Sequence, residues 1–132
     1  MSKAKVSIIL PMLNEAETIG KVIDEIPQRA LEQAGYSVEV LVVDNGSTDQ
    51  TAQIAREKGA RVITEPRRGK GRAVRTAFEQ VNADFVFMIN SDYTYPATYI
   101  PDMLNLLNQG YKKKVTDFLQ KRPECIRFSA NV

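Results

Sequence analysis

The sequence predicts an α/β fold, with a mainly parallel sheet held between two layers of helices. Four short apolar runs rich in β-branched residues, at positions 6–10, 38–43, 61–64 and 85–89, alternate with segments of helical pattern. The runs are apolar at successive positions, which is typical of strands that are covered on both faces. Alternation of strand and helix with right-handed crossovers therefore predicts a three-layer domain.

Apolar residues recur at helical spacing in three of the other segments. The stripes are Ile19, Val22, Ile23 and Ile26; Ala73, Val74, Ala77, Phe78 and Val81; and Ile100, Met103, Leu104 and Leu107. Pro27 interrupts the first stripe, and Asn14 with Glu17 three residues later resembles a capping pair at its start. We therefore predict three helices, the first beginning close to Asn14.

The composition excludes several kinds of catalytic site. The chain has 132 residues, a net charge of +2, one cysteine (Cys125) and no histidine. Without histidine, Ser-His-Asp and Cys-His catalysis and histidine metal sites are excluded, so an acid, base or ligand must come from other residue types. The single cysteine favours a reducing, cytoplasmic compartment, and the small net charge gives no argument for nucleic acid.

The two ends of the sequence raise the question of membrane contact. Residues 1–15 loosely resemble a signal peptide, but the apolar stretch is short and contains Ser7 and Pro11, so we interpret it as a strand. No segment reaches the roughly 20 apolar residues of a membrane span. We divide the chain into a domain at 1–109 and an unassigned basic tail at 110–132, which has six basic and two acidic residues. The tail is either a solvated end or a peripheral contact with an anionic membrane.

Ligands of such sheets bind beyond the carboxyl ends of the strands, which directs attention to residues 11–15, 44–49, 65–71 and 90–96. In the second of these segments, Asp44 ends a buried strand and is followed by an Asn-Gly turn and by hydroxyl residues. Asp44 either satisfies backbone amides of this turn or accepts a hydrogen bond from a base or a ribose.

The third segment is rich in cations and glycine. It carries Arg67, Arg68, Lys70, Arg72 and Arg75, with no acid among residues 66–78. Glycines at 69 and 71 precede a predicted helix, and such a helix start favours phosphate binding; the alternative is a solvated basic turn. It is not a Walker loop, because Thr64 stands where the first glycine is needed, and a third glycine of a dinucleotide fingerprint is missing.

The fourth segment, NSDYTYP, places Asn90 and Asp92 two residues apart after an apolar run. Amide and carboxylate oxygens are suitable ligands for Mg²⁺ or Mn²⁺, which in turn binds nucleotide phosphates. Three tyrosines, at 93, 95 and 99, either stack on a ligand or pack within the fold.

Together, the stretches VSIILPMLNEAETIGKVI, VEVLVVDNGSTDQTAQIA, GKGRAVRTAF and FVFMINSDYTYP resemble the nucleotide-sugar-binding half of the family 2 glycosyltransferases. Their fold is the three-layer, Rossmann-like GT-A fold. The similarity is greatest to dolichyl-phosphate and other polyprenyl-phosphate mannosyl- or glucosyltransferases, and it runs from about residue 5 to about residue 108. It implies hexosyl transfer from a donor such as GDP-mannose or UDP-glucose to a hydroxyl or a polyprenyl phosphate.

The resemblance also implies roles for individual residues. Those implied for the nucleotide sugar are Pro11, Leu13, Glu15, Val42, Asp44, Lys70, Ser91 and Asp92. Those implied for Mg²⁺ or Mn²⁺ are Asn90, Asp92 and Thr94. Asn90 stands where the family has the first aspartate of its Asp-x-Asp motif, so we expect metal binding to be weakened or lost.

The resemblance covers only the donor-binding half of the family, so the chain corresponds to a truncated form without an assigned catalytic base. An alternative function is therefore a non-catalytic nucleotide-sugar-binding or assembly module. Half a sheet would leave an apolar edge, which favours association with a second copy of the chain. A nucleotidyltransferase is a third, more distant possibility, which shares the α/β layout and metal-assisted phosphate chemistry.

Overall fold

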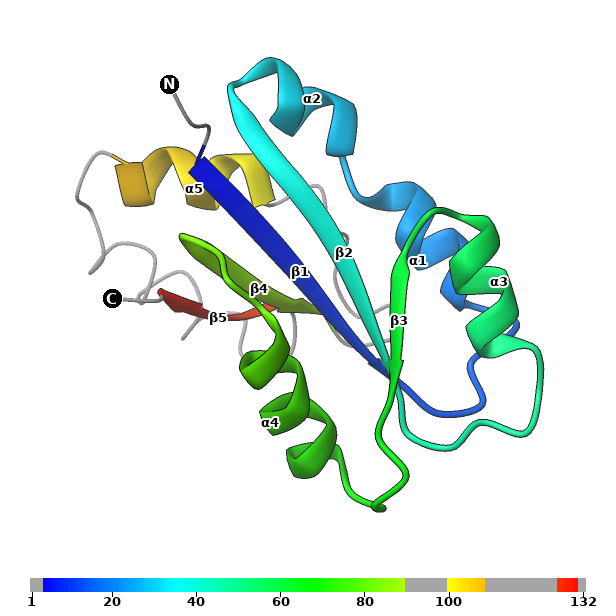
Figure 1. Cartoon of the computed structure of the whole chain (residues 1–132). Coiled ribbons are helices and arrows are strands. Elements are labelled where there is room, and N and C mark those ends of the chain that lie inside the picture. Colours follow the sequence, from blue (N-terminus) through cyan, green and yellow to red (C-terminus); the bar gives the residue numbers. More distant parts are fainter. Residues whose placement is uncertain (1–3, 90–99, 109–125, 131–132) are drawn as a thin grey trace.

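The structure of the protein, a computed structural model, describes residues 4–89, 100–108 and 126–130 (Figure 1). The helices and strands follow in the order β1 (Ala4–Met12), α1 (Ile19–Glu25), α2 (Gln28–Gln33), β2 (Tyr36–Asp44), α3 (Thr51–Glu57), β3 (Arg61–Thr64), α4 (Lys70–Gln80), β4 (Phe85–Ile89), α5 (Ile100–Asn108) and β5 (Ile126–Ala130). None of the helices in these ranges combines the length and the apolar character needed to cross a membrane.

The strands form one sheet in the order β3-β2-β1-β4-β5. The first four strands of this order are parallel, and β5 runs antiparallel to β4. The chain builds the sheet outward from β1 through β2 to β3, and then returns across it to β4. The strand order therefore reverses beside β1, and such a switch point is where ligands of open α/β sheets bind.

Helices cover both faces of the sheet, as the continuous apolar runs predict. On one face, α1, α2, α3 and α5 pack on a core that includes Ile8, Leu10, Val42 and Phe87. On the other face, α4 packs through Ala73 and Ala77 on the side chains of Ile9, Leu41, Val43 and others. Figure 1 shows α4 on the opposite side of the sheet from α1 and α3. This follows from right-handed crossovers, because the connection through α4 crosses the sheet in the opposite direction.

The register aligns the carboxyl ends of three strands. Met12 of β1 is opposite Asp44 of β2, which is in turn opposite Thr64 of β3. Backbone hydrogen bonds continue this row by one residue, from the Asn45 amide to the Met12 carbonyl and from the Glu65 amide to the Asp44 carbonyl, both at 2.9 Å. The segments that follow the three strands therefore begin side by side at one edge of the sheet.

Several local expectations need correction. The first helix begins at Ile19, and no side chain caps it, so Asn14 and Glu17 do not form a capping pair. After Pro27 the chain forms the short helix α2, which the sequence pattern did not indicate because Leu31 is its only buried residue. The stripe on α4 is narrower than expected, since Phe78 is 40% exposed. A strand, β5, lies within the basic tail at 110–132, whose sequence shows no clear periodicity.

Candidate functional site

A hollow of about 270 Å³ opens at the carboxyl edge of the sheet, beside the switch point. It is formed by the end of β1 and the following loop, the turn after β2, and the start of α4. The lining residues are Pro11, Met12, Leu13, Glu15, Asn45, Gly69 and Ala73. Leu13 is 50% exposed, more than any other large apolar side chain among the described residues, so it is free to contact a ligand.

The loops after β1 and β2 are held together by hydrogen bonds between backbone and side chains. The Asn14 amide donates to Ser47 Oγ at 2.9 Å, and the Thr48 amide donates to Asn14 Oδ1 at 2.9 Å. Asn14 has a φ of 53°, a left-handed conformation that asparagine adopts more readily than most residues. The reciprocal pair of bonds gives Asn14 a loop-bracing role in place of the expected helix cap.

A second set of bonds anchors the same loop to the start of α3. The Glu15 amide donates to Thr51 Oγ1 at 2.9 Å, and the Ala16 amide donates to Asp49 Oδ2 at 3.2 Å. Asp49 Oδ1 also accepts hydrogen bonds from the amide and the hydroxyl of Thr51. The Thr51 hydroxyl, followed by these amides, lowers the pKa of Asp49. Asp49 is therefore accounted for as a structural carboxylate.

Two roles were expected for Asp44: to bind backbone amides of the turn after β2, or to accept a hydrogen bond from a ligand. Asp44 is buried, with 6% of its surface exposed, and its Oδ1 accepts a hydrogen bond of 2.9 Å from the Ser47 amide. The turn role is therefore present. Its other carboxylate oxygen makes no hydrogen bond within the described part of the chain. Asp44 is not part of the lining, but the next residue, Asn45, is.

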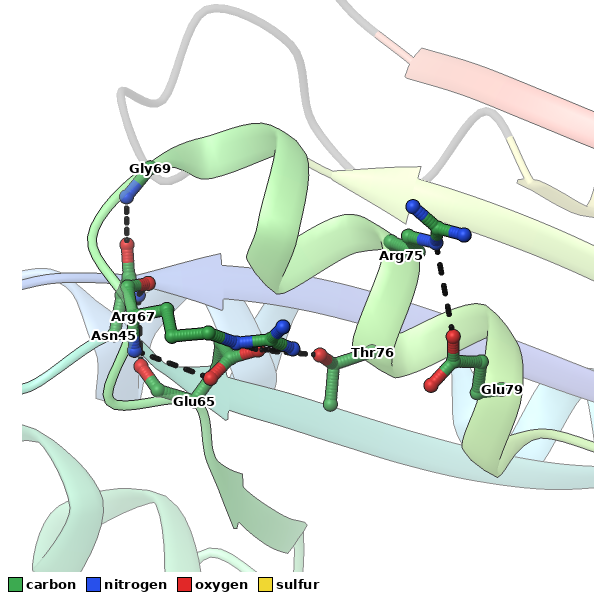
Figure 2. A network of polar contacts seen from close by, with 7 residues as sticks. All are labelled: Asn45, Glu65, Arg67, Gly69, Arg75, Thr76 and Glu79. Atoms are coloured by element: carbon green, nitrogen blue, oxygen red, sulfur yellow. Dashed lines mark hydrogen bonds and ion pairs between the residues drawn. The ribbon is translucent and has the colours of Figure 1, made fainter.

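The segment from β3 to α4 is shaped by Asn45 (Figure 2). Its side-chain nitrogen donates to the carbonyl oxygens of Glu65 and Arg67, each at 2.8 Å. Its Oδ1 accepts a hydrogen bond of 3.2 Å from the Gly69 amide. One amide side chain thus satisfies three backbone groups of the basic loop, which we define as residues 65–71. Gly69 has a φ of 124°, which a residue with a side chain adopts only under strain.

Glu65 lies beneath this loop as a buried carboxylate, 3% exposed. It forms an ion pair with Arg67 and accepts a hydrogen bond of 2.8 Å from the Thr76 hydroxyl of α4. The Arg67 guanidinium, with help from the Arg67 amide and the Thr76 hydroxyl, lowers the pKa of Glu65 to about 2. Glu65 is therefore ionised at neutral pH, and Arg67 serves as its counter-ion.

The structure describes some of the residues singled out from the sequence and not others. Pro11, Leu13 and Glu15 line the hollow. Val42 is fully buried in the core between β2 and the helices of the α1 face, and it is not part of the lining. Lys70 is the first residue of α4, directly after Gly69. The metal-binding and diphosphate-binding expectations for Asn90, Ser91, Asp92 and Thr94 lie outside the described residues.

Two residues that the sequence did not single out as site residues take central places. The sequence indicates Asn45 as part of a turn, and it includes Glu65 only as the first residue of the segment 65–71. The only sequence signal for Glu65 is an acid at a strand end, two residues before an arginine. Among the described residues, no group of three or more Cys, Asp or Glu side chains could hold a metal ion.

The parallel sheet, its switch point and the hollow at the carboxyl ends of the strands define an open α/β domain with a candidate ligand site at that edge. The chain belongs to glycosyl transferase family 2, whose family model matches residues 7–129. The expected family and fold are thereby confirmed. The family match also extends beyond residue 108, where the resemblance seen in the sequence ends, and it includes most of the β5 strand.

Three relatives are similar to this chain in sequence. The chain is 42% identical over 120 residues to the glycosyltransferase AglJ of Haloferax volcanii, covering 89% of this chain and 38% of AglJ. It is 36% identical over 120 residues to the dolichyl-phosphate hexose transferase of the same organism, covering 91% of this chain and 50% of the relative. It is 39% identical over 102 residues to the protein RfbJ of Shigella flexneri, covering 77% and 75%.

Solved structures are similar as well. Glucosyl-3-phosphoglycerate synthase of Mycobacterium tuberculosis, in complex with Mn²⁺, UDP-glucose and phosphoglyceric acid, has a TM-score of 0.66 to this chain and 33% sequence identity. The match covers 79% of this chain and 39% of the synthase. The chain thus spans well under half the length of this structure and of AglJ.

Proposed function

We propose that this chain binds the nucleotide part of a nucleotide-diphospho-sugar in the hollow beside the switch point. The observation that supports this proposal most directly is the wall of the hollow. This wall contains the apolar side chain of Leu13, the acid Glu15 and the backbone of the basic loop at Gly69. A second acid, Asp44, is next in the sequence to the lining residue Asn45. An apolar surface with a few polar groups suits a base and a ribose, and the loop before a helix suits phosphates.

In this proposal the base lies against Leu13 and hydrogen-bonds to the free oxygen of Asp44, with Pro11 and Glu15 completing the pocket. The diphosphate lies against Gly69 and the start of α4, where Lys70 follows. The described cations Arg68 and Arg72 are exposed near this position, so they add positive potential at the entrance. Arg67 contributes less, because Glu65 neutralises it.

We assign Asn90, Asp92 and Thr94 to a Mg²⁺ or Mn²⁺ ion and Ser91 to the diphosphate. The relatives support a divalent ion, since structures of the mycobacterial synthase contain UDP with Mn²⁺ or with Mg²⁺. When bound, such an ion stabilises negative charge on a leaving diphosphate. The donor set is one amide, one carboxylate and one hydroxyl, which is chemically suited to a hard cation but weakly charged.

The proposed reaction is hexosyl transfer from a donor of the UDP-glucose or GDP-mannose type. The bond between the anomeric carbon and the diphosphate oxygen breaks, and the nucleoside diphosphate leaves with the electron pair. An acceptor oxygen forms the new bond to the anomeric carbon, and any acceptor proton passes to a base. We propose a hydroxyl or a polyprenyl phosphate as the acceptor, for which the dolichyl-phosphate hexose transferase gives support. A lipid acceptor would place the chain at the cytoplasmic face of a membrane.

The proposal is tested by titrating the purified chain with UDP and with GDP, each with Mn²⁺ and again with EDTA. Metal-dependent binding of one nucleotide supports the proposal and identifies the base. Absence of binding for both nucleotides under both conditions contradicts it.

A second candidate function is donor binding without transfer, as a binding or assembly module. The observation that favours it is that Pro11, Leu13 and Glu15, which the sequence singled out for the donor, line the proposed donor hollow. Incubation with the bound nucleotide sugar and with polyprenyl phosphate distinguishes the two functions. Release of nucleoside diphosphate with formation of a glycolipid supports transfer, whereas stable binding without product supports the second candidate.

A further inference from the structure

A buried acid lies beneath a loop that is otherwise rich in cations. Glu65 is the first residue after β3, and it is one of the few buried polar residues in the described part of the chain. Burial of a carboxylate is costly unless it is paired and hydrogen-bonded. Glu65 has such partners, so the question is what the arrangement holds in place.

The contacts of Glu65 reach three separate parts of the fold, and Figure 2 draws those with Arg67 and with Thr76 of α4. Its carboxylate accepts hydrogen bonds from the Arg67 amide at 3.1 Å, from Arg67 Nε at 2.9 Å and from the Thr76 hydroxyl at 2.8 Å. Its own amide donates to the Asp44 carbonyl at 2.9 Å. One residue therefore connects the end of β2, the basic loop and the second turn of α4.

The bonded groups enclose the part of the loop that faces the hollow. Between Arg67 and Thr76 the chain passes through Gly69 and Ala73, which both line the hollow. The Ala73 amide also donates to the Gly69 carbonyl at 3.2 Å, which starts the helix from this loop. The Glu65 carboxylate bonds to Arg67 before this stretch and to Thr76 after it. The position of this wall of the hollow therefore depends on Glu65.

We propose that Glu65 is a positioning residue for the diphosphate: it binds Arg67 and Thr76 and so fixes the loop and helix start against which the phosphates lie. The inference rests on the proposed function. Arg67 then acts as the counter-ion within this arrangement and does not contact the ligand itself. The loss of Glu65 is expected to weaken binding of the phosphates more than binding of the base.

The first experiment compares wild type with Glu65→Gln for binding of the nucleoside diphosphate and of the corresponding nucleoside. We expect about a tenfold loss of affinity for the nucleoside diphosphate, because the loop that contacts the phosphates would no longer be held in position. The affinity for the nucleoside should change less than about twofold. The matched control is Glu57→Gln, which removes an exposed acid at the end of α3 that does not line the hollow, and it should change neither affinity. A general loss of structure would reduce both affinities in parallel.

A double-mutant cycle of Glu65→Gln and Arg67→Gln tests the role of Arg67. If both act through the same ion pair, the double variant loses no more diphosphate affinity than either single variant. Additive losses would mean that Arg67 contacts the diphosphate directly, and would overturn the inference.

Thr76 provides a variant that leaves the ion pair intact, in case Glu65→Gln does not fold. Thr76→Val removes only the hydroxyl, and we expect a smaller, diphosphate-specific loss that Thr76→Ser restores. Equal diphosphate affinity in wild type, Glu65→Gln and Thr76→Val overturns the inference while the proposed function stands. Failure of the wild-type chain to bind the nucleotide at all would instead refute the proposed function, and this inference with it.

Discussion

The buried hydroxyl of Thr51 accepts a hydrogen bond of 2.9 Å from the backbone amide of Glu15, and so joins the first residue of α3 to the loop after β1. Thr51 has no exposed surface, and its hydroxyl also bonds to Asp49. One wall of the hollow therefore depends on a residue that does not line it. The structure makes several such dependences testable.

The first prediction concerns Thr51→Val, which keeps the side-chain shape and removes the hydroxyl. We expect the free energy of unfolding to fall by about 1 to 3 kcal/mol, because the partly buried Glu15 amide loses its hydrogen-bond acceptor. Urea denaturation measures the change. Thr64→Val at an exposed position of β3 is the matched control, for which a change of under about 0.5 kcal/mol is expected. Equal effects at the two positions would contradict the assigned role of Thr51.

The second prediction concerns acid stability. Arg67 lowers the pKa of Glu65 to about 2, from an ordinary value of 4.5. The folded state therefore binds this proton less readily than the unfolded state, so the stabilisation is complete above pH 4.5 and is lost as the pH falls to about 2. Wild type should lose more stability than Glu65→Gln across this interval, as measured by urea denaturation at a series of pH values. If the stability of wild type and of Glu65→Gln fell in parallel with pH, the low pKa of the Glu65 carboxyl would be contradicted.

The third prediction compares two neighbouring glycines. Gly69 has a φ of 124°, so Gly69→Ala should destabilise the fold by about 1 kcal/mol or more through backbone strain, even though no atom would meet the new Cβ within 4 Å. Gly71 lies in α4 without a positive φ, and its Cβ would also meet nothing within 4 Å. Gly71→Ala should therefore stabilise the fold, by up to about 1 kcal/mol. Thermal unfolding of the two variants distinguishes these opposite signs, and the same sign for both would refute the argument.

The fourth prediction concerns the exposed Leu13 in the proposed base pocket. Leu13→Ala should reduce nucleotide affinity roughly fivefold through lost apolar contact and leave the unfolding temperature nearly unchanged. Phe78→Ala is the control, because Phe78 is the other large exposed apolar side chain of the described residues and is not part of the lining. Calorimetric titration of both variants provides the measurement. An equal loss from Phe78→Ala would argue against a base site at Leu13.

The fifth prediction concerns the metal. Asp92→Ala should abolish the metal-dependent part of nucleotide binding, because it removes the one charged ligand of the proposed set. Asn90→Asp should increase the difference in affinity between Mn²⁺ and EDTA, because it adds a negative charge next to Asp92. Nucleotide titrations with and without Mn²⁺ measure both effects. Unchanged metal dependence in both variants would remove this pair from the proposed metal site.

Much of the fold was predictable because most of its strands correspond to apolar runs that can be recognised locally in the sequence. The bounds of β3 and β4 agree with the apolar runs at 61–64 and 85–89, and the helix expected around Ala73 and Ala77 is α4. In contrast, α2 is too short to show a periodic pattern, and β5 is defined by its pairing with β4, a distant segment. The wrong expectation for Asn14 has the same origin, because its bonds go to residues 47 and 48, far away in sequence.

The sequence by itself determined the fold class and the segments that meet at one edge of the sheet, because strand periodicity and turn residues are encoded locally. The family was indicated by the resemblance of four sequence motifs. Only the tertiary structure decided which polar groups in those segments are already occupied. Asp49 bonds to Thr51 and Ala16, and Glu65 neutralises Arg67, whereas one oxygen of Asp44 has no partner in the described part of the chain. The physical reason is that the partner of a hydrogen bond or charge depends on the register of the strands and the position of α4, which arise from packing across the sheet.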